Sequence, residues 1–497
     1  MLENIQIGFD TAVTSQNLLY CFIGVTLGTF FGVLPGIGAL ASVSMLLPLA
    51  LYLPPATALI MLAGVYYGAE YGGSISSILL NLPGTPSNAV TCLDGYPLAL
   101  KGKAGLALFV TTISSYIGGT IGILALFLLS PLITSVALEF GPSEFFAVIL
   151  FGLIAAATVT DGSPLKGLSM VLIGLMLGTV GVDLETGVSR FAFGLDHLED
   201  GVSFIALATG LFGVSEIMMS IRNSKTKHQV KNLKFFEMIP TWSEFKSTLW
   251  PTIRGAVVGV FFGALPGTGP TIASFVGYSI EKRISKNPET FGKGALAGIA
   301  NPESANNAAA QSAFIPTLTL GIPGSATMAV MMGALLIHGI APGPQLINER
   351  PDLFWGLAVS FWIGNLMLLV LNIPLIGIWV RVLKIPYKLL YPAVILFVCI
   401  GAYAVQNSFF DVLSVLFFGV AGCVLRLKGY QLAPILIGFI LGPMLEEYFR
   451  RSMIIFNGDF SGFQHRPLAM FFGICAFSLI IFSVWKSVRP FFSKGTQ

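Results

Sequence analysis

The chain has 497 residues, of which 55% are hydrophobic and 10% are charged, and its formal net charge is +3. Soluble domains carry about 25% charged residues, so a water-facing surface for a protein of this size cannot be built from so few charges. The composition excludes a soluble globular protein, and the small net charge gives no reason to expect a nucleic-acid partner.

Long apolar stretches recur along the chain, for example at 105–129, 145–159, 205–220 and 470–484. Several approach the roughly 20 residues that a helix needs to cross a bilayer core of about 30 Å. Backbone polar groups in lipid must be satisfied within their own segment, so these stretches predict helices. We therefore expect an all-α polytopic membrane protein in a lipid bilayer. About 10–12 transmembrane helices, together with re-entrant or broken helices, would account for the apolar length.

Residues 24–39 and 255–270 are two copies of one motif. They read GVTLGTFFGVLPGIGA and GAVVGVFFGALPGTGP, and nine of the sixteen positions are identical at a spacing of 231. A second pair follows in the same order, ILLNLPGTPSNAV at 78–90 and LTLGIPGSATMAV at 318–330. Proline removes a backbone donor and glycine permits conformations closed to other residues, so each Pro-Gly pair predicts a broken helix. We expect two structural repeats, 1–221 and 251–497, joined by a cytoplasmic linker at 222–250.

The flanking charges predict that the two repeats are inverted in the membrane. Basic residues before and after 253–280 place both of its ends in the cytoplasm, namely Arg222, Lys225, Lys227, Lys231, Lys234, Lys282, Arg283, Lys286 and Lys293. This segment should then be a re-entrant hairpin with arms of about 12 residues, or roughly 18 Å. The matching first-half flanks, 1–19 and 50–58, contain no Lys or Arg, so that copy should enter from outside.

The four helix breaks are the predicted substrate site. Helices broken at membrane depth leave N–H groups free, and free N–H groups at a helix start bind anions. Hydroxyl and amide side chains around the second pair of breaks suit carboxylate oxygens. The candidate residues are Pro35, Gly36, Gly38, Ser74, Asn81, Pro83, Gly84, Thr85, Pro266, Gly267, Thr268, Gly269, Asn306, Asn307, Thr319, Pro323, Gly324 and Ser325. The structural alternative is helix kinking, glycine packing and interhelical hydrogen bonding.

Glu70 and Glu303 are acids in apolar or small-residue surroundings, and intramembrane ionisable residues are functional hypotheses by default. Either can carry a coupling proton when neutral or hold a cation when ionised. Pro302 should start or break a helix, which would place Glu303 near a helix N-terminus. The alternative is a structural acid that pairs with Lys293 or caps a helix. We expect no metal and no cofactor other than the coupling ion, Na⁺ or H⁺.

Sequence motifs of enzymes are missing from the chain. It contains no HExxH, GxSxG or Walker A pattern, and its five cysteines are scattered without a CxxC. We therefore expect a transport protein and not an enzyme.

The sequence resembles the large transmembrane subunit (TctA family) of tripartite tricarboxylate transporters. The resemblance covers nearly the whole chain and rests on FFGVLPGIGALASVSMLLP, YYGAEYGGSISSILLNLPGTPS, LDGYPLALKGKAG, NPESANNAAA and IPTLTLGIPGSATMAVMMGAL. It departs from the family pattern at Glu70, where the family often has an uncharged residue, and this counts against Glu70 as a shared coupling site.

The resemblance implies a multi-pass permease subunit in a bacterial inner membrane. Such a subunit imports organic anions of the tri- or dicarboxylate type, driven by a Na⁺ or H⁺ gradient. The implied partners are a small transmembrane subunit and a periplasmic solute-binding protein. A channel-like passive pore for small anions is the alternative, because pores also use broken helices.

Overall fold

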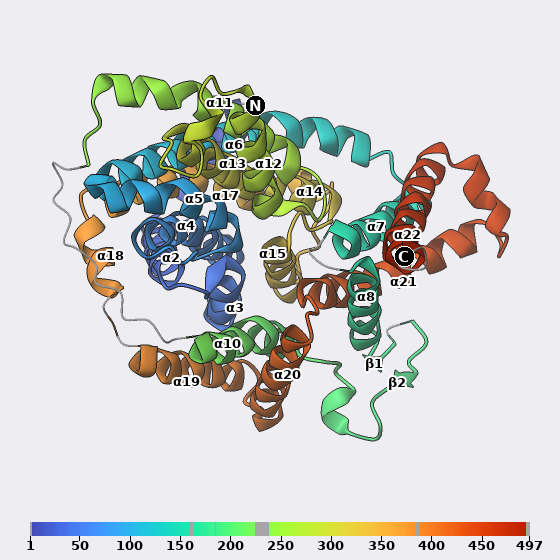
Figure 1. Ribbon diagram of the computed structural model, residues 1–497. Coiled ribbons are helices and arrows are strands. Elements are labelled where there is room, and N and C mark those ends of the chain that lie inside the picture. Colours follow the sequence, from blue (N-terminus) through green and yellow to red (C-terminus); the bar gives the residue numbers. More distant parts are fainter. Residues whose placement is uncertain are drawn as a thin grey trace.

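The computed structural model describes residues 2–159, 163–183, 185–223, 238–383, 385 and 387–493, and almost all of its regular elements are helices (Figure 1). In this part of the chain the one strand pairing is a short antiparallel hairpin, β1 (Gly181–Val182) with β2 (Ser189–Arg190). The all-α class is therefore confirmed. The linker lysines Lys225, Lys227, Lys231 and Lys234 lie outside the described residues.

The helices of the first half are α1 (Leu2–Ala12), α2 (Ser15–Val33), α3 (Gly38–Ala50), α4 (Pro55–Leu80), η1 (Pro86–Asn88), α5 (Ala89–Leu98), η2 (Ala99–Lys103), α6 (Ala104–Ala137), α7 (Pro142–Val159), α8 (Pro164–Gly178), η3 (Asp196–Leu198), α9 (Phe204–Ala208), η4 (Thr209–Val214) and α10 (Ser215–Asn223). Those of the second half are α11 (Trp242–Gly263), α12 (Gly269–Ile284), η6 (Pro288–Thr290), α13 (Ala297–Ser312), α14 (Phe314–Leu320), α15 (Ala326–Ile337), α16 (Leu346–Glu349), α17 (Pro351–Asn372), α18 (Ile376–Val382), α19 (Tyr387–Gln406), α20 (Phe409–Leu427), α21 (Ala433–Ile455), η7 (Phe460–His465) and α22 (Pro467–Ser493).

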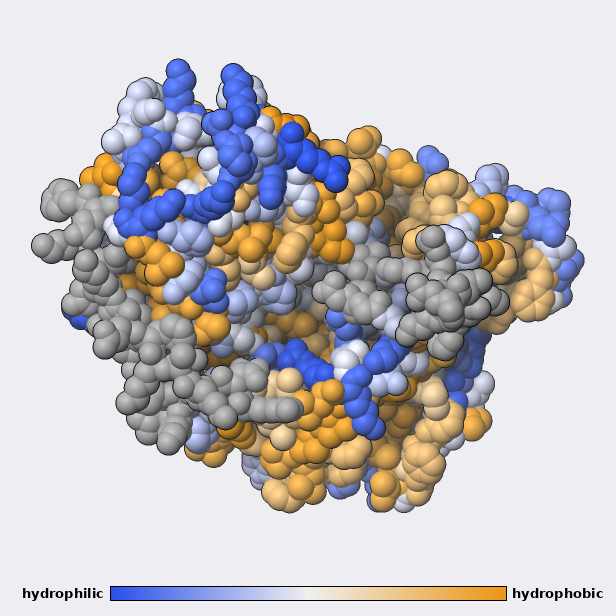
Figure 2. Space-filling view, in the orientation of Figure 1, coloured by the Kyte–Doolittle hydropathy of each residue, from blue (hydrophilic) through white to orange (hydrophobic). Residues whose placement is uncertain are grey.

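Much of the molecular surface is apolar, as a lipid-embedded protein requires. Figure 2 shows hydrophobic residues over much of one face, with hydrophilic residues gathered at its upper left and at its right edge. Five described helical stretches are long and apolar enough to cross a membrane: 15–33, 86–137, 204–221, 351–372 and 409–427. Several shorter apolar helices accompany them. The protein is a multi-pass membrane protein, and the total of ten to twelve crossings stays a prediction.

Glycines hold the first two long helices of each half in close contact. Along α2, a Cβ added at Gly28 would clash with the carbonyl oxygen of Val65 on α4, and one added at Gly68 on α4 would lie 2.7 Å from the Val25 oxygen. The second half repeats this arrangement, because a Cβ at Gly259 on α11 would lie 2.7 Å from the Ala308 Cβ on α13. Small residues let helix backbones approach closely in membranes. The two copies therefore share a packing mode as well as a motif.

The two halves interlock instead of lying side by side as separate bundles. The long helix α6 of the first half packs against α11 and α13, and α17 of the second half packs against α2, α4 and α6 (Figure 1). The related segments LIGLMLG (172–178) and LIGFILG (436–442) pack on each other, with Gly174 on the Ile435 carbonyl and Gly438 on the Val171 carbonyl. Each half thus completes the core of the other.

A polar loop fastens the first half to the second. The carboxylate of Asp94 on α5 accepts hydrogen bonds from the backbone N–H groups of Gly294 and Ala295, at 2.8 and 2.7 Å. Nearby, Lys101 donates to the Lys293 carbonyl at 2.6 Å. The LDGYPLALKGKAG stretch therefore anchors the loop that leads into α13.

The helix breaks occur where the repeated motifs predict them, and both copies have the same local geometry. The φ angles of Gly36 and Gly38 are 88° and 72°, and those of Gly267 and Gly269 are 80° and 62°. In the second pair, Asn81 and Gly321 end their helices in the left-handed region, with φ of 57° and 68°. The two copies of each motif therefore share a backbone conformation at the break, while the two repeats and their inversion across the membrane stay predictions.

The arms of the second-half hairpin are longer than we predicted. The arm before the break is α11, which has 22 residues, or about 33 Å of helix, and not 12. The helix starts early because Thr241 and Glu244 form a capping box, each side chain bonding the other's backbone N–H. The first turns of α11 are polar and lie inside the predicted linker, so hydropathy does not predict that they are helical.

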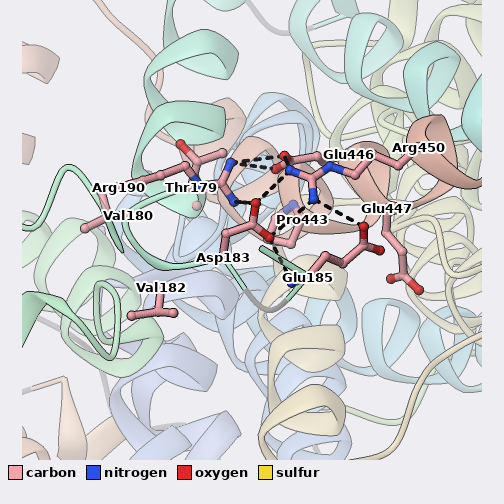
Figure 3. A pocket seen from close by; sticks show the side chains of 11 residues that line it. Thr179, Val180, Val182, Asp183, Glu185, Arg190, Pro443, Glu446, Glu447 and Arg450 are labelled. Carbon is pink, nitrogen blue, oxygen red and sulfur yellow. Dashed lines mark hydrogen bonds and ion pairs between the residues drawn. The ribbon is translucent and has the colours of Figure 1, made fainter. Parts of the chain in front are cut away.

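A pocket of about 360 Å³ between α8, the β-hairpin and α21 is crossed by ion pairs (Figure 3). Arg450 contacts Asp183 at 2.7 Å, Glu185 at 3.2 Å and Glu446 at 2.5 Å, and Arg190 contacts Glu446 at 3.0 Å. Hydrogen bonds from the Arg450 guanidinium, and then from the Glu185 backbone N–H, hold the pKa of Asp183 below its usual range. Carboxylates neutralise the charge of both arginines, and these ion pairs connect the β-hairpin to α21. We call this site the ion-pair pocket.

We predict that Gly28→Val strongly destabilises the protein. The added side chain meets the backbone of α4, which cannot yield as a flexible side chain does, so the cost should reach the upper end of about 1–3 kcal/mol. The measurement is thermal unfolding of the detergent-purified protein. Gly473→Val on α22 is the control, because a Cβ there meets nothing within 4 Å. Equal stability of the two variants would contradict this packing.

We also predict that Asp183→Asn lowers the thermal unfolding midpoint at pH 7 more than Glu185→Gln, which removes a single ion pair. Since the folded-state pKa of Asp183 is depressed, its contribution is present above the ordinary carboxyl pKa and is lost as the pH falls through the folded-state value. The gap between wild type and Asp183→Asn should therefore shrink only below about pH 4. Scanning fluorimetry across this pH range measures it, and a gap that closes above about pH 5 would refute the assignment.

Candidate functional site

The four helix breaks meet at one cavity of about 380 Å³, here called the tip cavity. Each break supplies part of its wall: Ala39 and Leu40 from the first, Thr85 to Ser87 from the second, Gly267 to Ile272 from the third, and Ser325 to Thr327 from the fourth. Tyr66, Glu70, Ala156, Gln431, Ala433 and Ile437 complete the lining. The breaks that the sequence predicts separately thus form a single site.

Direct contacts hold neighbouring breaks together. The Gly267 N–H donates to the Gly324 carbonyl oxygen at 3.1 Å, which joins the third break to the fourth. In the first half, a Cβ added at Gly38 would lie 3.8 Å from the Gly84 carbonyl oxygen, so the first break lies against the second. The geometry of the cavity therefore depends on backbone groups that only broken helices expose.

Helix N-termini surround the tip cavity. The first turns of α3, α12 and α15 line it, together with η1, which leads into α5. No side chain caps the start of α3 at Ile37 or that of α12 at Thr268, whereas Ser325 caps α15 by accepting from the Met328 N–H at 3.3 Å. Uncapped N–H groups and aligned helix dipoles favour an anion at this position. The cavity is therefore suited to carboxylate oxygens.

Glu70 extends from α4 into the wall of the tip cavity. It is buried, and its Oε2 accepts hydrogen bonds from Thr85 Oγ1 at 3.0 Å and Ser87 Oγ at 2.5 Å. Both donors belong to the second break. No ion pair joins Glu70 to a basic side chain of the described chain. The two hydrogen bonds that it accepts come from neutral hydroxyl groups.

Glu303 is also held by neutral groups, on four different sides. Its carboxylate accepts from Ser74 at 2.7 Å, from Asn88 and Ser115 at 3.3 Å each, and from Thr91. Lys293, the partner in the alternative interpretation of Glu303 as a structural acid, is not among its contacts in the described chain. The expected helix start is also wrong: α13 runs from Ala297 to Ser312 with Pro302 inside it, so Glu303 lies in the middle of a helix.

A continuous chain of hydrogen bonds connects the two acids, and we call it the carboxylate network. From Glu70 it passes through Thr85, whose hydroxyl oxygen lies 3.0 Å from Glu70 Oε2 and 2.5 Å from Asn88 Oδ1 and donates its single proton to one of these acceptors at a time. The Asn88 amide then donates to Ser74 Oγ at 2.8 Å, and Ser74 donates to Glu303. Residues from α4, η1 and α13 thus form one buried polar unit that joins the two halves.

The predicted site residues divide into groups. Those that line the tip cavity are Glu70, Thr85, Gly267, Thr268, Gly269 and Ser325. Gly36, Gly38, Pro83 and Gly84 line an adjoining cavity that is described below. Ser74 and Glu303 belong to the carboxylate network. Neither cavity is lined by Pro35, Asn81, Pro266, Asn306, Asn307, Thr319, Pro323 or Gly324.

Several residues of this last group support the structure around the site. Asn81 is exposed and forms the left-handed end of α4, and Thr319 donates to the Ile315 carbonyl within α14 at 2.7 Å. Gly324 joins two breaks through its carbonyl oxygen. On α13, the Asn307 amide donates to the Glu303 carbonyl at 3.1 Å, and Asn306 lies buried near Glu70 without a hydrogen bond of normal geometry.

Sequence reasoning missed Thr91, Ser115 and Arg426. The two hydroxyl residues lie on α5 and α6 in ordinary apolar contexts, and only the fold brings them to Glu303. Arg426 follows a long apolar run, where a basic residue is expected as a flanking charge. The structure instead places it on the wall of a second cavity of about 330 Å³, the arginine cavity, which shares Ala39, Leu40, Thr85 and Pro86 with the tip cavity.

In the described part of the chain, no group of three or more His, Cys, Asp or Glu side chains is placed to hold a metal ion. The oxygen-rich carboxylate network is a different kind of site, suited to a proton or to a hard monovalent cation.

Comparison with known proteins agrees with this geometry. The description "Tripartite tricarboxylate transporter TctA family" matches residues 18–437. An uncharacterized 52.8 kDa protein in the TAR-I ttuC' 3'region of Agrobacterium vitis is 47% identical over 489 residues, which cover 98% of this chain and 97% of the relative. A second uncharacterized Agrobacterium vitis protein, in the TAR-II ttuC' 3'region, is 50% identical over 231 residues, 46% of this chain and 96% of the relative.

A more distant relative comes from Methanocaldococcus jannaschii. This uncharacterized protein is 26% identical over 285 residues, 54% of this chain and 64% of its own length. No solved structure gives a significant match. The family description covers more than four-fifths of the sequence, including all four helix breaks and both buried acids. This chain therefore belongs to the tripartite tricarboxylate transporter TctA family.

Proposed function

We propose that this chain is the permease subunit of a binding-protein-dependent secondary active transporter that imports organic anions of the tri- or dicarboxylate type. The observation that carries the proposal is the convergence of helix starts from both halves on the tip cavity. Broken helices whose N-termini point at an anionic substrate group are a recurring design of secondary transporters. A volume of about 380 Å³ suits a small metabolite.

The carboxylate network supports coupling to a Na⁺ or H⁺ gradient. Glu70 lines the tip cavity, so an ionised Glu70 would repel a carboxylate substrate there. At a separation of about 4 Å and an effective dielectric constant of 20, two like charges repel by about 4 kcal/mol. A proton or cation bound in the network removes this repulsion. Binding of the coupling ion and of the substrate would then favour each other, as thermodynamic linkage requires.

Glu303 is the main candidate for the coupling group and Glu70 the second. Four neutral side chains donate hydrogen bonds to the Glu303 carboxylate. These side chains can remain around the carboxylate whether it binds a proton or a cation. Glu70 lies nearer the substrate and shares the network through Thr85 and Asn88. A shared network allows the state of one acid to influence the other, although Glu70 departs from the family pattern.

The membrane arrangement that we propose is a pair of inverted repeats in a bacterial inner membrane. The two copies of the break lie against one cavity, and their flanking charges differ as inverted segments require. The family name describes a tripartite system. We propose a small transmembrane subunit and a periplasmic solute-binding protein as the partners.

A passive pore for small anions is the competing function. A pore would carry solute only down its gradient, so the network of two buried acids would have no role in accumulation. Uptake against a concentration gradient distinguishes the two functions.

We predict that Glu303→Gln retains exchange of solute across the membrane but loses accumulation. The amide keeps the shape of the carboxylate while removing the charge that binds the coupling ion. The measurement is counterflow and gradient-driven uptake in proteoliposomes that contain the complete transporter. Glu144→Gln is the matched control, because Glu144 is a buried acid that bonds Gly141 and Ser143 away from the network. Normal accumulation by Glu303→Gln would make Glu303 a structural acid.

The inverted topology predicts that single cysteines at Ser15 and Ser247 react with an impermeant thiol reagent from opposite faces of the membrane. Both serines are exposed and lie near the starts of α2 and α11, the corresponding helices of the two repeats. The five native cysteines are first replaced, and labelling is compared in intact cells and in inside-out vesicles. Labelling of both positions from the same face would exclude inversion.

A further inference from the structure

The arginine cavity adjoins the tip cavity and places a cation beside the broken helices. Its wall contains Gly36 to Ala41 from the first break, Pro83 to Pro86 from the second, and Phe212, Glu216 and Arg426. The two cavities share part of their lining at Ala39 and Thr85. A solute that leaves the tip cavity on this side would therefore pass Arg426 next.

Arg426 and Glu216 form an ion pair across this cavity, between the end of α20 and the start of α10. Their side chains are 29% and 16% exposed, so the pair faces the cavity and is not sealed in a core. Gly36 lies against it without a side chain: a Cβ there would be 3.9 Å from Glu216 Oε1. No other residue of the described chain forms an ion pair with Arg426.

The positive-inside rule predicts that this cavity faces the cytoplasm. Lys428 follows Arg426 after one residue, and its carbonyl accepts a hydrogen bond from Lys166 at 2.8 Å. Lysines gather on the cytoplasmic side of membrane proteins. The arginine cavity therefore lies on the path by which an imported solute would leave.

We propose that Arg426 is an anion-recognition residue on the exit path, and that a carboxylate of the departing substrate exchanges with Glu216 for its guanidinium. This inference rests on the proposed function. Glu216 and the substrate present the same chemical group, so the Arg426 guanidinium, which bonds Glu216 through one N–H group, can donate to either carboxylate. The uncapped first turn of α3, from Gly38 to Ala41, lines the same cavity and supplies further donors.

The exchange explains why this path holds one arginine paired with an acid inside the protein. A free arginine there would bind the anion tightly and slow its release. Because Glu216 competes for the guanidinium, the anion leaves Arg426 when the ion pair between Arg426 and Glu216 forms again. In the ion-pair pocket, by contrast, Arg450 contacts three carboxylates at once, which leaves it no exchangeable partner.

Two readings of the pair predict different mutant behaviour. If the pair only fastens α10 to α20, loss of either partner should damage stability and leave substrate affinity unchanged in the folded protein. If Arg426 receives the substrate, loss of Glu216 removes a competitor and loss of Arg426 removes the binding group. The two substitutions should then change affinity in opposite directions.

The test is equilibrium binding of labelled succinate, malate and citrate to the full-length chain in lipid nanodiscs, with the solute that binds wild type most tightly used for all variants. We expect Arg426→Gln to raise the Kd roughly tenfold or more, Arg426→Lys to raise it less, and Glu216→Gln to lower it. Arg350→Gln is the control, since Arg350 pairs with Asp352 away from both cavities.

Each outcome is decisive. If Arg426→Gln does not fold, Arg426→Lys and Glu216→Gln still give the two directions of change. Wild-type binding with an unchanged or raised Kd in Glu216→Gln overturns the role of Arg426 and leaves the proposed function intact. If wild type binds none of the three carboxylates while the complete transporter accumulates one of them, the role of Arg426 is overturned and the proposed function stands. If the complete transporter accumulates none of them either, the proposed function fails as well.

Discussion

The structure depends on one constraint: a helix that is broken inside an apolar bundle must have its exposed N–H and C=O groups satisfied by protein or by ligand. The Pro-Gly breaks create such groups in both halves, and the fold brings them together around one cavity. Some are satisfied by each other, as between Gly267 and Gly324. The starts of α3 and α12 have no side-chain cap and so remain available. The close glycine packing of α2 on α4, and of α11 on α13, fixes the breaks at the positions where this arrangement is possible.

Periodicity, hydropathy and self-comparison predict the helical class, the repeat and the residues at which helices break. These features are local, because a Pro-Gly pair determines backbone conformation wherever it occurs. The start of α11 was hidden, since a capping box, which hydropathy does not detect, extends the helix into a polar stretch. Pro302 predicts a helix start near Glu303, but long-range packing against α6 and α11 keeps α13 continuous. Thr91, Ser115 and Arg426 could not be found, because their roles arise only when segments from distant parts of the chain meet.

The carboxylate network gives physical content to the idea that two acids act together. Glu70 and Glu303 belong to different halves and are joined through Thr85, Asn88 and Ser74. Four of these five residues lie on α4 or in the break between α4 and α5, so any movement of the second break changes the bonds of both acids. A conformational change that opens the tip cavity would therefore alter ion binding without a separate transmitting element. Coupling of this kind needs only one structural element with two conformations, provided that the coupling ion and the substrate both shift the equilibrium between them.

The positively charged groups of this protein differ in how readily they could bind and release an anion. In the ion-pair pocket, Arg450 is surrounded by Asp183, Glu185 and Glu446, an arrangement that suits a permanent tie. Among the described residues, no Lys or Arg lines the tip cavity, which offers backbone donors to an anion. These donors are weaker than an arginine and move with the backbone when a break moves. Arg426 lies between these extremes, with one acidic partner and an open cavity. A transporter must both bind and release its solute. Neutral donors in the tip cavity, followed by an arginine for which Glu216 competes, meet both needs along a single path.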